Sequence, residues 1–191
     1  MKILSIVNQK GGVGKTTTSI NLAACLHKMK RKVLLIDLDP QSNATRGSGV
    51  DSATLQSSVN DVLLGRSSID EAIVSSVHDG YDLLPATPTL TESEVSLVSK
   101  NNREFILKNT LEDISSNYDY ILMDCPPSLN ILTVNSLVSA TGVLIPVQCE
   151  FYALQGLSEL VNTINQIQSS SNESLKIEGI LRTMFDSRNN L

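Results

Sequence analysis

The stretch of sequence that decides the fold is Lys10-Gly11-Gly12-Val13-Gly14-Lys15-Thr16-Thr17. It follows an apolar run from Ile3 to Val7, which predicts a strand, and it leads into a segment from Thr16 to Lys30 whose apolar residues have helical spacing. Small residues allow successive backbone N–H groups to point at phosphate oxygens, and the helix presents its positive N-terminus to the same anion. The order of strand, glycine-rich loop and helix therefore predicts a nucleotide-binding P-loop.

The loop departs from the usual P-loop pattern at a specific position. In G-x-x-x-x-G-K-[ST], the lysine reaches the β- and γ-phosphates, and the hydroxyl that follows it binds Mg²⁺. Gly14, Lys15 and Thr16 fit this pattern, but Gln9 replaces the first glycine and a second lysine stands at Lys10. The sequence thus has a variant P-loop with two lysines.

The composition sets the class of protein. The chain has 191 residues, of which 41% are hydrophobic, enough for one α/β domain with a substantial core. Its formal net charge of −5 excludes a uniformly basic surface, so any contact with DNA must come from a local cluster or from dimerisation. No apolar run approaches the ~20 residues of a membrane helix and the N-terminus shows no leader, so we expect a cytoplasmic protein without membrane contact.

The three cysteines, Cys25, Cys125 and Cys149, are odd in number, lack metal-ligand spacing and lie in segments that we expect to be buried. Such a set of cysteines is typical of a protein in a reducing compartment, and no disulfide is expected. His27 and His78 stand apart from any metal-type cluster and receive no role.

Short apolar runs that end in a carboxylate alternate with segments of helical spacing. Val33–Ile36 is followed by Asp37, and Tyr120–Met123 is followed by Asp124. This β-α-β order predicts a mostly parallel, twisted sheet with helices on both faces and ligands at the carboxyl ends of the strands. Further strands are expected near 81–84, 142–147 and 176–184, and helices near 59–64, 69–74, 105–114 and 154–167.

We expect a single P-loop domain over residues 1–191. Residues 41–102 are less regular and rich in Ser, Thr and Asn, but they contain neither a repeat nor a linker. An α/β sheet usually ends with a helix over its last strand, and the sequence stops soon after 176–184. The domain is therefore expected to lack its C-terminal portion.

Three carboxylates are expected at the mouth of the sheet. Asp37 and Asp39 lie just beyond a strand end, so that one could hold the metal shell while the other orients water. Asp124 precedes Cys125-Pro126-Pro127, at the usual position of a carboxylate that holds Mg²⁺ directly or through water. A lone aspartate at a strand end is often a cap or turn residue, but three of them beside a P-loop favour a metal and water site.

Four motifs together resemble the deviant-Walker partition ATPases of the ParA/Soj type. They are K-G-G-V-G-K-T-T at 10–17, D-L-D-P-Q at 37–41, D-C-P-P-S at 124–128 and P-V-Q-C-E-F-Y-A-L-Q-G-L at 146–157. The resemblance spans nearly the whole chain. MinD-like division-site ATPases and nitrogenase iron proteins are similar through the first loop, whereas the segments 37–41 and 146–157 favour the ParA/Soj branch.

The resemblance implies catalytic and binding roles for these residues. Lys10 would be the signature lysine that reaches across an ATP-sandwiched dimer to the partner's phosphates, and Asp39 would position the attacking water. Asp37 and Asp124 would support Mg²⁺, with Thr16 as a direct ligand. An added cation at the transferring phosphoryl group is typically worth ~10³–10⁵ in rate. The ATP cradle would consist of Lys10, Gly11, Gly12, Val13, Gly14, Lys15, Thr16 and Thr17.

The resemblance also implies a function. The protein would be a Mg²⁺-dependent ATPase, slow unless stimulated, that forms a homodimer with ATP, binds DNA without sequence preference and partitions chromosome or plasmid DNA. A centromere-binding adaptor of the ParB/Spo0J type would stimulate hydrolysis at the nucleoid. Arg188 matches a position where the family carries a DNA-contacting arginine, and Arg182 lies near it. A solvated arginine is the alternative interpretation of Arg188.

Other activities occur on related folds. A MinD-like membrane-cycling ATPase would need a C-terminal amphipathic helix with a basic polar face, which these residues do not contain. The sequence of an ATP-dependent biosynthetic amidoligase should add a glutaminase domain with a nucleophilic cysteine, and neither Cys125 nor Cys149 has a histidine beside it in sequence. An iron–sulfur reductase would need cluster-ligating cysteines, for which Cys125, followed by Pro126-Pro127, is a poor match.

Overall fold

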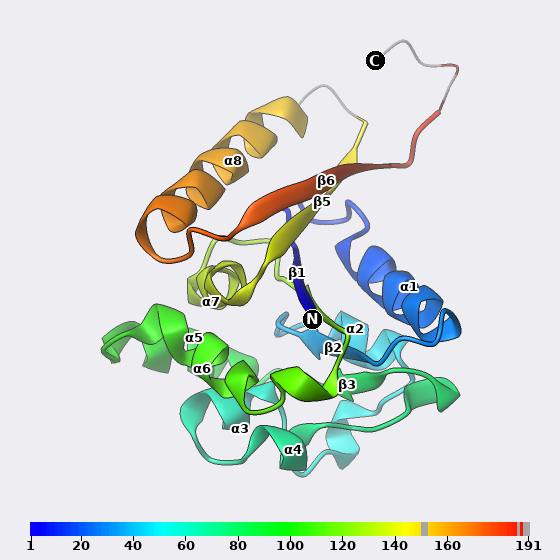
Figure 1. The fold of residues 1–191 in the computed structure, drawn as a ribbon, viewed down its shortest axis with the longest axis vertical. Coiled ribbons are helices and arrows are strands. Elements are labelled where there is room, and N and C mark those ends of the chain that lie inside the picture. The colour runs from blue at the N-terminus through cyan, green and yellow to red at the C-terminus, as the bar shows by residue number, and fades with distance from the viewer. Residues whose placement is uncertain (150–152, 187, 189–191) are drawn as a thin grey trace.

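A computed structural model describes residues 1–149, 153–186 and 188 of the chain. Within these residues the strands form one six-stranded parallel sheet in the order β3-β2-β4-β1-β5-β6 (Figure 1). The predicted parallel sheet is confirmed, and each strand lies within one residue of the expected bounds. The strands are β1 Lys2–Ile6, β2 Val33–Asp37, β3 Asp82–Leu84, β4 Tyr120–Asp124, β5 Gly142–Gln148 and β6 Lys176–Thr183.

Helices cover both faces of the sheet, as predicted (Figure 1). On one face lie α1 (Lys15–Lys28) and α2 (Asn43–Gly47). The other face is covered by α3 (Val59–Leu64), α4 (Ile69–Ala72), α5 (Leu90–Ser96), α6 (Ile106–Glu112), α7 (Ile131–Ser139) and α8 (Ala153–Ser170). Short 3₁₀ turns connect them: η1 Ser52–Thr54, η2 Val77–Asp79, η3 Leu97–Ser99, η4 Arg103–Phe105 and η5 Ser115–Asn117.

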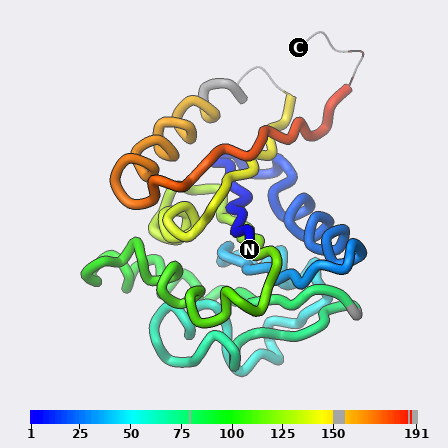
Figure 2. Tube along the Cα trace, viewed as in Figure 1, coloured from blue at the N-terminus to red at the C-terminus, as the bar shows by residue number. Residues whose placement is uncertain are grey.

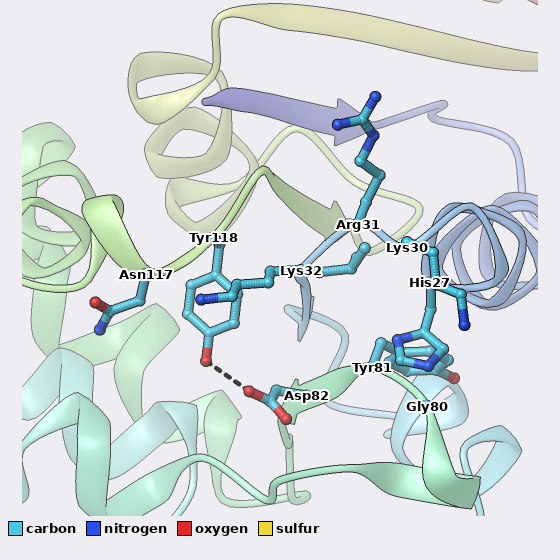
Figure 3. Close-up of a pocket in the computed structure, with 10 residues that line it drawn as sticks. His27, Lys30, Arg31, Lys32, Gly80, Tyr81, Asp82, Asn117 and Tyr118 are labelled. Atoms are coloured by element: carbon cyan, nitrogen blue, oxygen red, sulfur yellow. Dashed lines mark hydrogen bonds between the residues drawn. The ribbon is translucent and has the colours of Figure 1, made fainter.

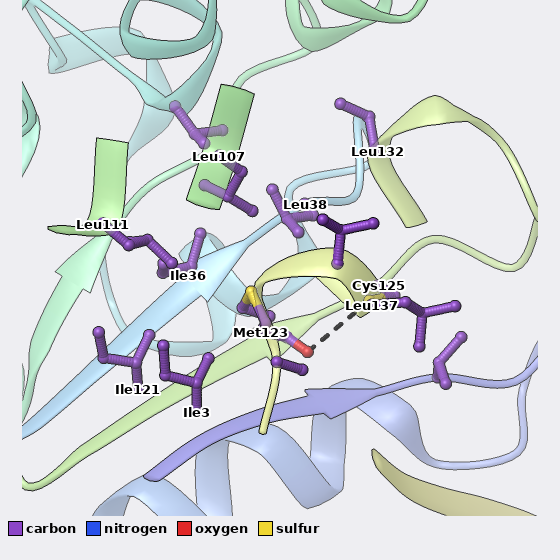
Figure 4. Packing of buried hydrophobic residues seen from close by; sticks show 14 of the residues in the cluster. Ile3, Ile36, Leu38, Leu107, Leu111, Ile121, Met123, Cys125, Leu132 and Leu137 are labelled. Atoms are coloured by element: carbon purple, nitrogen blue, oxygen red, sulfur yellow. Dashed lines mark hydrogen bonds between the residues drawn. The ribbon is translucent and has the colours of Figure 1, made fainter. Parts of the chain in front are cut away.

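Alternate residues of the central strands contribute to two hydrophobic cores. In β2, Leu34 and Ile36 pack with the helices α3 to α8, whereas Val33 and Leu35 pack with α1 and α2. Figure 4 shows the larger core, in which side chains of α6 and α7 close over those of β1, β2 and β4. Full burial of one such side chain stabilises the fold by about 1.5–3 kcal/mol. Many of them line both faces of the central strands, so the sheet and the ends of its strands are held in fixed positions.

The less regular segment 41–102 fills the β3 end of the sheet, while α8 and β6 form the opposite end (Figure 2). Ser58 and Ser68 begin α3 and α4 with capping boxes, in which the serine and the third helical residue satisfy each other's backbone N–H groups. Both helices start at the expected residue. The second ends at Ala72, two positions earlier than expected.

The structure corrects two expectations about burial. Cys25 is exposed and Cys149 is half-buried, so that only Cys125 is buried as expected, although all three thiols are free. Met29, which shares the helical spacing of Leu22 and Leu26 in the segment 16–30 and would be buried with them, is 68% exposed. The reason is that α1 packs closely through its small residues Ser19 and Ala23.

Sequence periodicity also missed α2, α5 and α7. In α7 nearly every residue is buried, including several polar ones. Asn135 shows how this is tolerated: its Nδ2 donates to the Arg103 carbonyl at 2.9 Å, and its Oδ1 accepts from the Leu107 N–H at 3.0 Å. A helix buried all round has no polar stripe, so the spacing of its apolar residues does not reveal it.

The strand register brings the acidic strand ends together. Asp37, the last residue of β2, pairs with Asp124, the last residue of β4. Ile6, the last residue of β1, also pairs with Asp124. The P-loop therefore starts at the same edge of the sheet as the two carboxylates. Within the described part of the chain, no helix is long and apolar enough to cross a bilayer.

Candidate nucleotide site

The loop between β1 and α1 takes a left-handed backbone conformation at two positions. Gly12 and Gly14 have φ values of 75° and 89°, which glycine adopts without steric cost. Gly14 is also the N-cap of α1, and it supplies no side-chain acceptor to the N–H groups of the first helical turn. The positive N-terminus of α1 is therefore suited to an anion from outside the chain.

Lys15 lies under this loop. Its side chain is buried, and its Nζ donates to the Lys10 carbonyl at 3.1 Å. Burial lowers the pKa of Lys15, while the nearby carboxylates of Asp124 and Asp39 oppose that shift. Among the described residues, its hydrogen-bond acceptor is one neutral carbonyl, and a charged phosphate oxygen would be a stronger acceptor, so the lysine is suited to an anionic ligand.

A pocket of about 410 Å³ unites the P-loop with Asp39. This volume lies within the usual range for small-molecule sites. The sequence predicted the loop and Asp39, but it gave no sign of Met184, which reaches the pocket from the end of β6. The lining consists of Gly11, Gly12, Gly14, Lys15, Thr16, Thr17, Asp39, Gln41, Asn43, Pro127 and Met184.

A larger hollow of about 500 Å³ lies at the opposite, amino-terminal edge of the sheet (Figure 3). Its lining includes His27 and Lys32, and the Tyr118 hydroxyl donates to Asp82 across it at 2.9 Å. Burial and the Asp82 charge raise the pKa of Tyr118. This hollow contains none of the predicted site residues and no glycine-rich loop, so the smaller pocket is the candidate site.

Asp37 is fully buried and both of its carboxylate oxygens accept hydrogen bonds. Oδ2 accepts from the backbone N–H and the hydroxyl of Thr45, at 2.8 and 2.7 Å, and Oδ1 accepts from the Asp39 N–H at 3.1 Å. Burial raises the pKa of Asp37 to about 6. The Thr45 hydroxyl also accepts from the Ala86 N–H at 2.9 Å. Asp37 thus holds α2 and the turn that carries Asp39 in place. The sequence did not predict the role of Thr45, because no motif marks this residue.

Asp124 is fully buried, and among the described residues only one of its oxygens accepts a hydrogen bond. Oδ1 accepts from the Ser19 hydroxyl at 2.9 Å, whereas Oδ2 has no hydrogen-bond partner within the described residues. Burial and the Asp37 charge raise the pKa of Asp124 to about 7, against the opposing effects of Thr16, Ser19 and Lys15. Ser19 follows Lys15 by one helical turn, a spacing that could have indicated its role.

Asp124 Oδ2, which accepts no hydrogen bond from the described residues, could bind a cation, and the oxygen ligands around it suit Mg²⁺. Mg²⁺ prefers oxygen ligands and is usually held by one or two protein groups together with substrate phosphates. Thr16 and Asp124 supply a hydroxyl and a carboxylate at this place. Among the described residues no group of three or more His, Cys, Asp or Glu could hold a metal, so a metal here would depend on the phosphates for its remaining ligands.

Asp39 faces the loop from a fixed turn. Its side chain is largely buried, and its Oδ1 accepts from the Gln41 N–H at 2.9 Å. Burial, together with the charge of Asp39, raises the pKa of Glu94 in α5. The geometry therefore places a second carboxylate near Asp39, which the sequence did not single out.

Lys10 lies at the exposed rim of the loop. Its backbone N–H donates to Asn8 Oδ1 at 2.9 Å, and Asn8 Nδ2 donates to the Pro146 carbonyl at 2.7 Å. Asn8 thus connects the base of the loop to β5. The Lys10 carbonyl accepts from Lys15 Nζ at 3.1 Å, and Lys10 itself is exposed.

Arg188 lies away from the pocket. Its side chain is 86% exposed and forms an ion pair with Asp186 at 2.6 Å. The guanidinium of Arg182 stacks on the ring of Phe185, 4.6 Å from its centroid. Residues 150–152 of the motif at 146–157 lie outside the described part of the chain, as do the side chains of 153–155.

Comparison with known proteins reveals relatives over nearly the whole chain. The AAA domain family matches residues 1–177. The sporulation initiation inhibitor protein Soj of Bacillus subtilis (strain 168) is 50% identical over 190 residues, which cover 100% of this chain and 75% of that protein. The chromosome partitioning protein ParA of Myxococcus xanthus (strain DK1622) is also 50% identical over 190 residues, covering 100% of this chain and 67% of the relative.

A solved structure of another name has the same fold as this chain. The crystal structure of cobyrinic acid a,c-diamide synthase from Mycobacterium smegmatis with bound ADP and magnesium superimposes with a TM-score of 0.95. It is 41% identical, and the match covers 99% of this chain and 77% of that one. By sequence and by fold, the chain belongs to the ParA/Soj family of deviant-Walker partition ATPases.

Proposed function

We propose that this chain is a Mg²⁺-dependent ATPase that dimerises on ATP and partitions chromosome or plasmid DNA. The observation that carries the proposal is the pocket in which the glycine loop, Lys15 and Asp39 meet at the carboxyl edge of the sheet. The bound ADP and magnesium of the related crystal structure support a nucleotide at this place. The name of the Myxococcus relative supports chromosome partitioning as the task.

In this proposal the first turn of α1 and the loop 10–17 bind the phosphates. Lys15 exchanges the Lys10 carbonyl for a phosphate oxygen, which replaces a neutral acceptor by a charged one. Thr16 and Asp124 would hold Mg²⁺, which neutralises charge that develops on the transferred phosphoryl group. Asp37 stabilises the turn so that Asp39 can orient the attacking water.

Lys10 would act on the nucleotide of a second protomer. The exposure of Lys10 at the start of the loop supports this role, since an exposed side chain can reach a second protomer across an interface. A cation supplied in trans stabilises the transition state only when two protomers meet. Hydrolysis would therefore depend on dimerisation, and it would be slow until a ParB-like adaptor stimulates it.

DNA binding would depend on the same dimer. The net charge of −5 does not favour nucleic acid, but two protomers double the basic contacts on one face, and affinity rises steeply with each phosphate neutralised. Arg188 is highly exposed, and its pair with Asp186 is a surface ion pair, which a phosphate can replace at little cost. The protein would then be a cytoplasmic switch that associates with the nucleoid in its ATP-bound state.

A biosynthetic amidoligase is the second candidate, because the related crystal structure carries a diamide synthase name. Cys125 does not supply the nucleophile that its glutaminase reaction would need. This thiol is buried, hydrogen-bonds Ser136 Oγ at 3.1 Å, and has a pKa that burial raises to about 11. Such a cysteine stays protonated near neutral pH and is a weak nucleophile.

A MinD-like membrane-cycling ATPase receives no support from the longest helix. Residues 153–170 of α8 contain neither lysine nor arginine. A helix that binds an anionic membrane surface usually carries several of them on its polar face.

Light scattering with and without ATP and Mg²⁺, combined with a DNA mobility shift, tests the proposal. We expect a monomer without nucleotide, a dimer with ATP and Mg²⁺, and a DNA shift only in the latter state. A permanent monomer, or DNA binding that ignores ATP, would contradict it. ATP turnover that requires glutamine and is unaffected by DNA would favour the amidoligase.

A further inference from the structure

The end of β6 is tied directly to the P-loop by one side chain. Thr183 Oγ1 donates to the Val13 carbonyl at 2.8 Å, although the two residues are 170 positions apart. β6 is the edge strand of the sheet and is separated from β1 by β5 (Figure 1). The hydrogen bond therefore links the end of β6 to the loop that follows β1, past the intervening strand β5.

The two halves of the Thr183 side chain contact neighbouring parts of the loop. The hydroxyl holds the Val13 carbonyl, and the methyl group faces Gly14, where an added Cβ would lie 3.5 Å from Cγ2. In a planar trans peptide the C=O and the following N–H point in opposite directions. Holding the Val13 carbonyl against β6 thus directs the Gly14 N–H away from Thr183, and Gly14 lines the nucleotide pocket.

The residue after Thr183 continues over the pocket. Met184 lines the pocket and has a left-handed φ of 51°, a conformation that costs a non-glycine residue free energy and persists only where its surroundings hold it. Arg182 and Phe185 stack on each other and brace this turn from both sides. The turn 182–185 therefore contacts the loop through Thr183 and lines its pocket through Met184.

We propose that Thr183 is a positioning residue, which fixes the peptide between Val13 and Gly14 for phosphate binding and couples the P-loop to the turn 182–185. This inference rests on the proposed binding of ATP. Coupling is reciprocal: if the β6 end orders the loop for nucleotide, nucleotide must order the β6 end by the same free energy. Arg188 follows this turn within a few residues, so its position would depend on whether the pocket is filled.

Two substitutions separate the hydroxyl from the methyl group. Thr183→Val keeps the shape and removes the donor, whereas Thr183→Ser keeps the donor. Thr163→Val is the matched control, because the Thr163 hydroxyl also donates to a backbone carbonyl, that of Glu159 at 3.1 Å, but on the surface of α8. All three would be compared with the wild-type chain for Mg²⁺–ATP affinity, KM, kcat and thermal unfolding without nucleotide.

We expect Thr183→Val to bind ATP roughly 3- to 10-fold more weakly, the factor for one neutral hydrogen bond, with KM raised and kcat little changed. Thr183→Ser and Thr163→Val should bind like the wild type. Amide hydrogen exchange in 180–186 should slow when ATP and Mg²⁺ are added to the wild type, and much less in Thr183→Val.

The outcomes distinguish this inference from the proposed function. If the wild type binds ATP and Thr183→Val binds within about twofold of it, the positioning role is wrong and the proposed function stands. If the wild type itself does not bind ATP, the proposed function fails. Should Thr183→Val not fold, Thr183→Ser decides, because weakened binding by a variant that keeps the hydroxyl would contradict the role of the hydrogen bond.

Discussion

Replacing Asp124 by asparagine should make the metal-free protein more stable at high pH, although it should also abolish Mg²⁺ binding. Asp124 is fully buried, and its Oδ2 has no hydrogen-bond partner within the described residues. Burial and the charge of Asp37 raise its pKa to about 7. An ionised carboxylate in such a place costs free energy, and an amide of the same shape removes that cost.

The magnitude follows from the pKa shift. Unfolded, Asp124 titrates near its ordinary value of 3.8, and folded at about 7, so the folded state keeps a proton that the unfolded chain has lost. Wild-type stability therefore falls as the pH rises from the lower to the upper value, by ~4 kcal/mol in total. Between about pH 5 and about pH 8, the wild type should lose roughly 2–3 kcal/mol relative to Asp124→Asn. Asp37 is present in both proteins, so the comparison reports the titration of Asp124 together with its coupling to Asp37.

Urea unfolding in EDTA, followed by circular dichroism over this pH range, measures the difference. Asp51→Asn is the control, because Asp51 is an exposed residue that caps a 3₁₀ turn. This control shows how far the replacement of an exposed carboxylate by an amide changes the free energy of unfolding over the same pH range. The reasoning is refuted if the gap between Asp124→Asn and the wild type changes by less than about 1 kcal/mol, or if the variant is the less stable protein at high pH.

Three further substitutions test other parts of the site. Asp39→Ala should leave ATP binding and dimerisation intact but stop turnover, and unchanged steady-state hydrolysis would exclude Asp39 as the water-orienting residue. Thr45→Val should lower the free energy of unfolding in urea by about 1–3 kcal/mol, because buried Asp37 loses a donor; an unaltered value would show that the bond is dispensable. Arg188→Ala should weaken DNA binding uniformly across sequences and reduce the salt slope by ~1, whereas an identical slope would mark Arg188 as merely solvated.

Much of the fold was predictable because its signals are local. The apolar runs that end at Asp37 and Asp124 predict parallel strands, and the spacing of the glycines in 10–17 predicts the loop between β1 and α1. Parallel strands place their carboxyl ends at one edge, so the meeting of the loop with the acidic strand ends followed from topology.

The parts that escaped prediction depend on contacts distant in sequence. Thr45 and Met184 carry no motif, and only the folded chain brings them to Asp37 and to the pocket. The sequence did not reveal the environment of each carboxylate either. Both oxygens of Asp37 accept hydrogen bonds, whereas one oxygen of Asp124 accepts none from the part of the chain that the structure describes. Cys25 was placed in the core because its segment is apolar, but burial on a helix depends on which face packs, and α1 packs through Ala23.

The central claim is that the loop 10–17 binds Mg²⁺–ATP through Lys15. Isothermal titration calorimetry of ATP with Mg²⁺ into the wild type and Lys15→Ala tests it most directly, with circular dichroism to show that both are folded. We expect one nucleotide per wild-type chain and an affinity lowered roughly 10²-fold or more in the variant, since charged hydrogen bonds to phosphate are lost. Near-normal affinity in Lys15→Ala would contradict the assignment of this loop as the nucleotide site.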